Sequence, residues 1–236
     1  MNYRNSVQQY NNTIRNLWES KFKKAINAST KNIVEFSQPC FHITQNESPV
    51  WFIGMNPSLV KSDDKHHDIL TRNSKLTDSL VAKLAENQKN MHENYQYFKV
   101  AKDFFANDVG IDELVTPIFH DLYPIRHTKQ NEFVKFLGDS SLRESLDEAT
   151  KNIFDQIMPD ILVIANAGAS KRIKEIFFKD VQSNSTTLTY EKNGKKTHMI
   201  FSSMLSGQRA LDTYSRSRLA REIRETWRSK IRNEHT

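Results

Sequence analysis

The sequence predicts a single three-layer α/β domain over residues 1–236, with helices on both faces of a short, mostly parallel sheet of four strands. Three observations lead to this prediction. Apolar, strand-like runs are interleaved with helical runs along the chain, which is the pattern of strand–helix–strand folds. Residues 161–178 are typical of a strand, a turn and a helix in direct succession. Three of the apolar runs end in polar turns, and open α/β sheets bind ligands at such strand ends.

The first third of the chain combines a helix, a strand and a polar excursion. Residues 1–49 are a helical lead-in, because apolar side chains recur at helical spacing over residues 7–27. The run Val50–Ile53 is apolar throughout and predicts the first, buried strand. Residues 60–94 are polar and charged, with a helix at 77–86 and little core material, so we expect an excursion at the mouth of a site.

The middle of the chain alternates helices with the second and third strands. Helical spacing returns at 95–105, and the second strand is predicted at 114–122. A helix over 142–158 then precedes the third strand, at 161–165, which a helix over 170–178 follows directly. This order of elements builds a parallel sheet.

The last third contains a hairpin and a basic helix. Residues 186–191 and 195–201 flank Asn193-Gly194, a dipeptide that is typical of two-residue hairpin turns. Residues 213–231 form a closing helix that is rich in arginine.

Composition limits the classes of function. The chain has 37% hydrophobic and 26% charged residues and a net charge of +6, which is compatible with a polyanionic partner but also occurs in proteins that never bind nucleic acid. Cys40 is the only cysteine, which excludes an internal disulfide, a cysteine-rich zinc site and a four-cysteine iron–sulfur cluster. No apolar run reaches the roughly 18 residues of a membrane span. The polar residues 1–6 lack the apolar segment of a signal peptide, so we expect a cytoplasmic protein.

The first strand ends in Gly54-Met55-Asn56-Pro57-Ser58, which predicts a tight, polar turn. Gly54 lets the backbone bend or approach a ligand closely, because it carries no Cβ. Pro57 fixes its own φ and disfavours helical geometry at Asn56. The Asn56 amide is therefore expected in a rigid turn that faces the end of the strand.

Three turns together resemble motifs of the uracil-DNA glycosylase superfamily, in order and over residues 50–228. Gly54-Met55-Asn56-Pro57 resembles the first motif of the single-strand-selective monofunctional branch and, extended through Ser58-Leu59, that of the mismatch-specific uracil/thymine branch. Phe119-His120-Asp121-Leu122-Tyr123-Pro124 resembles the second-strand segment of the single-strand-selective branch. Residues 160–169 are similar to the third strand and its turn. Ser206-Gly207, followed by a basic helix, is similar to the second catalytic motif of the mismatch-specific branch.

The resemblance implies a monofunctional DNA glycosylase that hydrolyses the N-glycosidic bond of a damaged or modified pyrimidine, either uracil or a cytosine derivative. It assigns Asn56 as the catalytic residue, which positions the attacking water. An amide can orient a water but is a very poor base, which suits a reaction in which the base departs first. The alternative is that Asn56 only stabilises an Asn-Pro turn. No lysine stands at the motif positions to form a Schiff base, so lyase chemistry is not expected.

Asp121 departs from the family pattern, which has an asparagine that reads the uracil edge. Uracil presents the O4 acceptor and the N3–H donor, and an ionised carboxylate offers only acceptors. A protonated Asp121 would mimic the amide, which requires a raised pKa. We therefore expect a preference for a base with an exocyclic amine, such as a modified cytosine. The alternative is that Asp121 only caps the turn before Pro124. On strand alternation, His120 points away from Asp121 and is expected either to be packed or to support a site residue from behind, and not to be a catalyst.

The third motif lacks the histidine that many family members use to donate to the leaving base, since Met204-Leu205-Ser206 stands there. Met204 and Leu205 either form an apolar wedge that fills the gap left by a flipped base or pack under the last strand. Ser206 and Gly207 would bind a phosphate, with Gln208, Arg209 and Arg216 extending that surface. The more distal arginines of the closing helix are the weaker candidates.

The expected site is therefore formed by three groups of residues. Asn56 is catalytic; the base-binding residues are Gly54, Met55, Phe119, Asp121 and Tyr123; and the DNA-binding residues are Ser58, Met204, Leu205, Ser206, Gly207, Gln208, Arg209 and Arg216. Phe119, Tyr123 and Tyr95 are alternatives for the ring that stacks on the extruded base.

The expected partner is DNA, single- or double-stranded, bound by a monomer without cofactor or metal. His66-His67-Asp68 lacks further ligands at metal-binding spacing and is expected to be solvated. Two rival functions stay open. One is a non-catalytic nucleic-acid or nucleotide-binding module on the same fold. The other is a small-molecule enzyme such as a nucleotide hydrolase, although no Gly-rich phosphate loop is evident.

Overall fold

A computed structural model describes residues 2–22, 24, 37–42, 47–55, 75–111, 115–127, 130–138, 140–179, 185–205 and 210–234. The chain divides into two compact units, and three separate stretches of sequence build each of them. The first unit contains Met1–Gln45, Met55–Asn90 and Asp121–Ile157. The second contains Asn46–Gly54, Met91–His120 and Met158–Thr236.

The second unit is built on a mixed five-stranded sheet. Its strands lie in the order β3-β2-β5-β7-β6, and they are β3 Ile118–Asp121, β2 Val50–Gly54, β5 Ile161–Ala165, β7 Lys195–Ser202 and β6 Thr187–Lys192. β5 runs parallel to both of its neighbours, with Ile53 opposite Ile164 and Ala165 opposite Ser202. β6 runs antiparallel to β7. The α/β class is thus confirmed.

The prediction of a four-stranded, mostly parallel sheet is wrong in its strand count. The fifth strand is β6, the first arm of the predicted hairpin, which joins the sheet beside β7. Asn193 and Gly194 form the turn with φ values of 51° and 77°, the left-handed region in which these residue types are tolerated. The turn places β7 antiparallel to β6, so β6 and not β7 is the edge strand on that side of the sheet.

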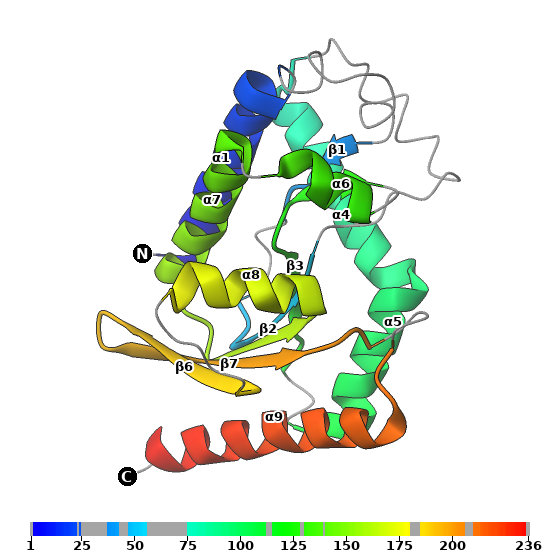
Figure 1. The fold of residues 1–236 in the computed structure, drawn as a ribbon, viewed down its shortest axis with the longest axis vertical. Helices are drawn as coiled ribbons and strands as arrows, with labels where there is room; N and C mark the ends of the chain where they lie inside the picture. The colour runs from blue at the N-terminus through cyan, green and yellow to red at the C-terminus, as the bar shows by residue number, and fades with distance from the viewer. Residues whose placement is uncertain are drawn as a thin grey trace. The chain divides into compact units, whose positions relative to one another are not determined.

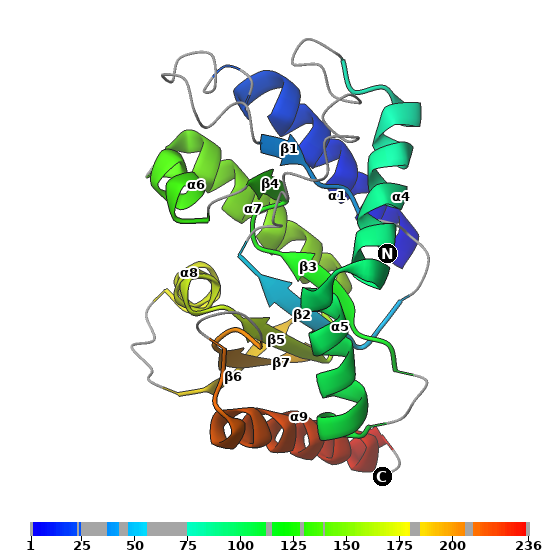
Figure 2. The ribbon, with the colours of Figure 1, turned by 90° about the vertical axis from the view of Figure 1, so that its right-hand side faces the viewer.

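Helices cover both faces of this sheet (Figure 1; Figure 2). α8 Ala167–Phe177 lies on one face. The other face is covered by α9 Thr213–Glu234 and by α5 Gln96–Asp103, which continues as the π-helical segment η4 Phe104–Val109. The second face is packed by a cluster of buried apolar residues that includes Phe52, Phe104, Val163 and Ile223. All five residues of β5 are buried, as expected for a parallel strand covered on both sides.

The first unit is mainly helical. It contains α1 Tyr3–Leu17, which continues as η1 Trp18–Phe22, most of α4 Asp78–Asn94, α6 Gln130–Leu137 and α7 Ser141–Ile157. α1 packs along α7, with Val7, Tyr10 and Ile14 buried on its inner side. A small antiparallel pair, β1 Ser37–Pro39 and β4 Ile125–His127, completes the described part of the unit.

Several element boundaries differ from those predicted. The second strand begins at Ile118 rather than near residue 114, because Pro117 has no N–H for the ladder. α4 runs from Asp78 to Asn94 and buries Leu84 and Met91, so this part of the supposed excursion does contribute core side chains. The rest of that excursion, residues 60–74, lies outside the described residues.

Candidate functional site

The ends of three parallel strands meet at one edge of the sheet, which we call the carboxyl edge. It is formed by the last residues of β2, β5 and β7, which are Gly54, Ala165 and Ser202. After β2, the next strand of this sheet along the chain is β3, which lies on one side of β2 in the strand order. After β5, β7 lies on the other side of β5, so the strand order reverses direction between β2 and β5. A ligand crevice in open α/β sheets forms outside the strand ends at such a switch point.

The turn after β5 is stabilised by hydrogen bonds to the side chain of its first residue, Asn166. Asn166 is buried, and its side-chain oxygen accepts hydrogen bonds from the backbone N–H groups of Gly168 at 2.9 Å and Ala169 at 3.1 Å. These bonds cap α8, which therefore begins at Ala167, three residues earlier than predicted. Ser170 donates to the carbonyl oxygens of Ile164 and Ser202, at 3.4 and 3.3 Å, and links the ends of β5 and β7.

The turn after β2 is only partly described. Gly54 ends β2 and is half-buried, and Met55 follows it with its side chain buried. Asn56, the predicted catalytic residue, lies outside the described residues, as do Pro57 and Ser58. The Met55 carbonyl accepts a hydrogen bond from the backbone N–H of Tyr123 at 2.9 Å. This bond joins the first predicted motif to the second, because Tyr123 stands two residues after Asp121.

Asp121, the last residue of β3, belongs to a group of titratable side chains that we call the polar cluster. Its members are Tyr10, Cys40, Asp121 and Arg126. Burial raises the pKa of Asp121 to about 7, and the Arg126 guanidinium opposes that rise without cancelling it. Close to neutral pH the carboxyl group is therefore present in both its protonated and its ionised form.

The other members of the polar cluster stay neutral at that pH, except Arg126. Burial raises the pKa of the Cys40 thiol to about 12, against the opposing charge of Arg126. Burial is also the main cause of the raised pKa of Tyr10, to which the charges of Cys40 and Asp121 add. Arg126 is itself buried, and its Nη2 donates to Oε1 of Gln88 at 2.7 Å. The polar cluster thus has one permanent charge and one carboxyl group that titrates near pH 7.

The two predicted stacking rings of the second motif are both interior side chains. Phe119 is buried and packs against Phe52, Phe98 and His92, with ring centroids 5.8, 5.1 and 5.8 Å away. Tyr123 is 1% exposed, and its hydroxyl donates to Oδ1 of Asp147 at 3.2 Å. As described, neither ring presents a face on which a base could stack.

His120 is packed, as predicted. It is 3% exposed, and its ring lies 5.5 Å from that of Trp51. The alternation of β3 thus places Phe119 in the aromatic core and His120 against Trp51 of β2, within the second unit.

The third motif is described only up to Leu205. Met204 is half-buried and forms an isolated bridge with Ala210, whereas Leu205 is 5% exposed and belongs to the apolar cluster on the α9 side of the sheet. For Leu205 this favours the packing alternative over the wedge. Ser206, Gly207, Gln208 and Arg209 lie outside the described residues.

Arg216, the remaining predicted DNA contact, is engaged with a neighbouring helix. Its Nε and Nη2 donate to Oδ2 of Asp108 at 2.8 and 2.5 Å, and its guanidinium lies 5.3 Å from the centroid of the Phe104 ring. Arg224 on the same side donates to the carbonyl oxygens of Val109 and Asp108. Both arginines therefore hold α9 against η4.

Sequence reasoning missed three members of the polar cluster, Tyr10, Cys40 and Arg126. Arg126 stands only two residues after the end of the second motif, but the pattern carries no signal that its side chain is buried. As the only cysteine, Cys40 served to exclude an internal disulfide, a cysteine-rich zinc site and a four-cysteine iron–sulfur cluster. Its backbone N–H donates to the carbonyl oxygen of Pro124 at 2.7 Å, and this long-range bond brings it beside the second motif.

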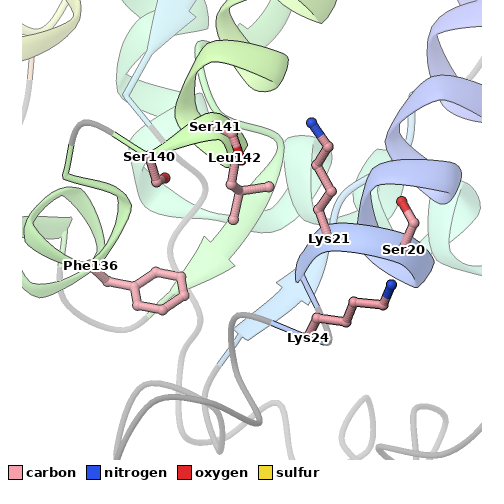
Figure 3. Close-up of a pocket in the computed structure, with 7 residues that line it drawn as sticks. All are labelled: Ser20, Lys21, Lys24, Phe136, Ser140, Ser141 and Leu142. Atoms are coloured by element: carbon pink, nitrogen blue, oxygen red, sulfur yellow. The ribbon is translucent and has the colours of Figure 1, made fainter.

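The first unit also contains a cavity of about 330 Å³, which no predicted site residue lines (Figure 3). Phe136 and Leu142 provide its apolar side, and its polar lining consists of Ser20, Lys21, Lys24, Ser140 and Ser141. Lys21 Nζ donates to Ser145 Oγ at 2.7 Å, and Ser140 Oγ accepts from the backbone N–H of Arg143 at 3.3 Å, so part of this lining serves the fold.

Two further observations concern metal ligands and membrane helices. Over the described ranges, no three His, Cys, Asp or Glu side chains are grouped so that they could hold a metal ion, and His66-His67-Asp68 lies outside those ranges. None of the helices in the described part of the chain is both long and apolar enough to cross a membrane.

Comparison with known proteins adds no relative. No protein-family model matches this chain, and no curated protein matches it significantly.

Proposed function

We propose that this chain is a monofunctional DNA glycosylase that hydrolyses the N-glycosidic bond of a damaged or modified pyrimidine, with Asn56 positioning the water and Asp121 reading the base edge. The observation that carries the proposal is the hydrogen bond of 2.9 Å between the Tyr123 N–H and the Met55 carbonyl. It connects the turn that contains Asn56 to the segment that contains Asp121, two motifs about 65 residues apart in the sequence.

The arrangement of the strands gives further support. β2, which leads into the first motif, and β7, which leads into the third, flank β5 and end at the same carboxyl edge. A base-excising enzyme needs its water-positioning group and its base-binding and DNA-binding loops within reach of one extruded nucleotide. The common edge at which β2 and β7 end supports the proposal for the first and third motifs, because ligands of open α/β sheets bind outside such strand ends.

The electrostatics of Asp121 support the choice of base. A carboxyl group whose pKa is raised to about 7 supplies a protonated form that can donate to cytosine N3 and accept from the exocyclic amine. The same form can donate to uracil O4 and accept from N3–H. The ionised form repels O4, so ionisation disfavours uracil more strongly than it disfavours a base with an exocyclic amine.

The test is a panel of labelled oligonucleotides that carry uracil, cytosine or modified cytosines, scored for abasic sites. We expect Asn56→Ala to lower the rate of base release at least about 100-fold, because the attacking water is no longer held in line. Asn152→Ala, at an exposed position of α7, is the matched control and should retain the activity. Equal activity of the two variants would refute the role of Asn56.

The role of Asp121 has its own test on the same panel. Asp121→Asn restores an amide at this position, so we expect faster release of uracil relative to amine-bearing bases. If the wild-type protein and Asp121→Asn were both inactive on every base in the panel, the glycosylase proposal would fail.

A non-catalytic nucleic-acid-binding module is the second candidate. The absence of a histidine from Met204-Leu205-Ser206 favours it, since losing one donor to a developing anion can cost an enzyme a few kcal/mol. This candidate predicts salt-dependent binding of oligonucleotides without abasic sites.

A further inference from the structure

The outward face of α9 combines an exposed aromatic ring with a row of arginines. Tyr214 is 79% exposed, and among the described residues it is the one large hydrophobic side chain that is exposed to solvent. The opposite side of the helix packs into the core through Leu219, Ala220 and Ile223. Burial therefore fixes which face of α9 is turned to solvent.

Three arginines follow Tyr214 on this face at helical spacing. They are Arg218, Arg221 and Arg228, which stand four, seven and fourteen residues after the tyrosine, and all three are exposed. Within the described part of the chain, Arg221 and Arg228 have no acidic partner, and Arg218 lies 3.8 Å from Glu222. The distal arginines are thus the available ones, whereas Arg216 is occupied by Asp108.

The N-terminal end of α9 lies at the carboxyl edge of the sheet. The backbone N–H of Leu211, three residues before Tyr214, donates to the carbonyl oxygen of Met204 at 2.9 Å. At the other end of the helix, Lys230 pairs with Asp160, which directly precedes β5. α9 therefore runs back across the sheet, and its tyrosine is at the edge where β5 and β7 end.

Among the described side chains of α9 and its N-terminal cap, three are acidic, and two of them accept hydrogen bonds. Asp212 caps α9 by accepting from the backbone N–H and the hydroxyl of Ser215, at 2.8 and 3.1 Å. Glu222 accepts from the hydroxyl of Thr186 at 3.3 Å. Glu225 is exposed and stands between Arg221 and Arg228. On the face itself, the three arginines Arg218, Arg221 and Arg228 outnumber the single carboxylate of Glu225, a net charge of +2 that complements a polyanion.

We propose that Tyr214, Arg218, Arg221 and Arg228 form a binding surface for single-stranded DNA. The tyrosine ring stacks on an unpaired base, and the arginines contact successive phosphates, which is how stacking platforms hold a single strand. From Tyr214 to Arg228 the helix rises about 21 Å, the length of about six phosphates at the spacing of one B-DNA strand. This inference deepens the proposed function and rests on it for the identity of the polyanion.

Fluorescence anisotropy with a labelled oligodeoxyadenylate tests the surface separately from catalysis, because this probe contains no pyrimidine to release. We expect Tyr214→Ala to weaken binding about 5- to 100-fold and Tyr214→Phe to retain it, since stacking needs the ring and not the hydroxyl. The loss should be smaller on a duplex, whose bases are already stacked. Unchanged affinity of Tyr214→Ala for the single strand would overturn the proposal.

The arginines are tested by the dependence of affinity on salt. Arg221→Gln combined with Arg228→Gln should reduce the slope of log K against log salt by about 1.4, or about 0.7 for each lost phosphate contact on a single strand. The double variant Arg4→Gln with Lys83→Gln removes the same charge from exposed positions of α1 and α4 and should leave the slope unchanged. Glu225→Gln should strengthen binding. Equal slopes for the two double variants would overturn the role of the arginines.

The two proposals fail in different ways. If no variant or substrate gives abasic sites but oligodeoxyadenylate binding depends on Tyr214, the glycosylase proposal falls and the DNA-binding surface stands. If base release is measured but Tyr214→Ala binds as tightly as the wild-type protein, the surface falls and the enzyme stands.

Discussion

Asp121 is the residue on which the proposed specificity depends. Its carboxyl group ends a strand, lies beside the Arg126 guanidinium and has a pKa raised to about 7 by burial. Arg126 would be expected to keep a carboxylate ionised, but here burial is the larger effect. The Asp121 carboxyl group is therefore neither permanently ionised nor permanently protonated. Its protonation state changes within the physiological pH range.

Asp121→Asn should change how stability depends on pH. Because the folded-state pKa is raised from 3.8 to about 7, the folded protein holds a proton that the unfolded chain releases between these values. The stabilisation of the wild-type protein by this proton is full below about pH 4 and is lost as pH rises through 7. We expect the free energy of unfolding of the variant, relative to wild type, to increase by up to about 4 kcal/mol from pH 4 to pH 8.

Urea unfolding of both proteins at several pH values measures this difference. Asp103→Asn, at an exposed position of α5, is the matched control and should follow the wild-type protein at every pH. A difference between Asp121→Asn and wild type that does not vary with pH would contradict the titration of Asp121 in the folded state.

At the scale of elements, the turn after β5 shows how one side chain determines where a helix begins. Asn166 accepts two backbone N–H groups of the first turn of α8, and this turn directly follows a strand that is buried on both faces. The cap therefore contributes to helix stability and also ends β5 at the carboxyl edge.

Asn166→Ala should lower the free energy of unfolding by about 1 kcal/mol, because two N–H groups lose their acceptor. Asn166→Asp keeps an acceptor oxygen at the same place and should lose less. Urea denaturation compares the two variants with Asn152→Ala, which removes an exposed amide from α7. Equal stability of Asn166→Ala and Asn152→Ala would mean that the cap is not needed.

At the scale of the whole molecule, no continuous stretch of sequence makes either compact unit. β2 lies at residues 50–54, whereas its neighbour β5 lies more than 100 residues later, at 161–165. The sheet therefore requires contacts between distant segments, and such contacts form only when most of the chain is present.

A fragment that ends at residue 157 should consequently fail to fold cooperatively. It lacks β5, β7 and α9. β2 therefore loses its parallel partner β5, and the apolar cluster around Phe52 loses the side chains that these elements contribute. Unfolding of the fragment followed by near-UV circular dichroism, with the full chain as reference, measures this. A sharp, cooperative transition of the fragment would show that the first unit folds without the second.

The sequence alone was sufficient for those features that depend on local patterns. Apolar runs predicted β2 and β5 to within a residue, Asn193-Gly194 predicted the hairpin, and strand alternation predicted that His120 is packed. Strand and helix periodicity, turn propensity and side-chain alternation are properties of neighbouring residues, so they can be read before the chain is folded.

Only the tertiary structure decided which polar and aromatic side chains are available. In the folded chain Phe119 and Tyr123 are buried, whereas Tyr214 is exposed. Arg216 pairs with Asp108, and Asp121 lies among the other members of the polar cluster. Periodicity predicts which residue types favour burial, but the exposure of one ring and the pKa of one carboxyl group depend on segments that are distant in the sequence. β6 joined the sheet for the same reason, since strand pairing is a contact between segments and not a property of either one.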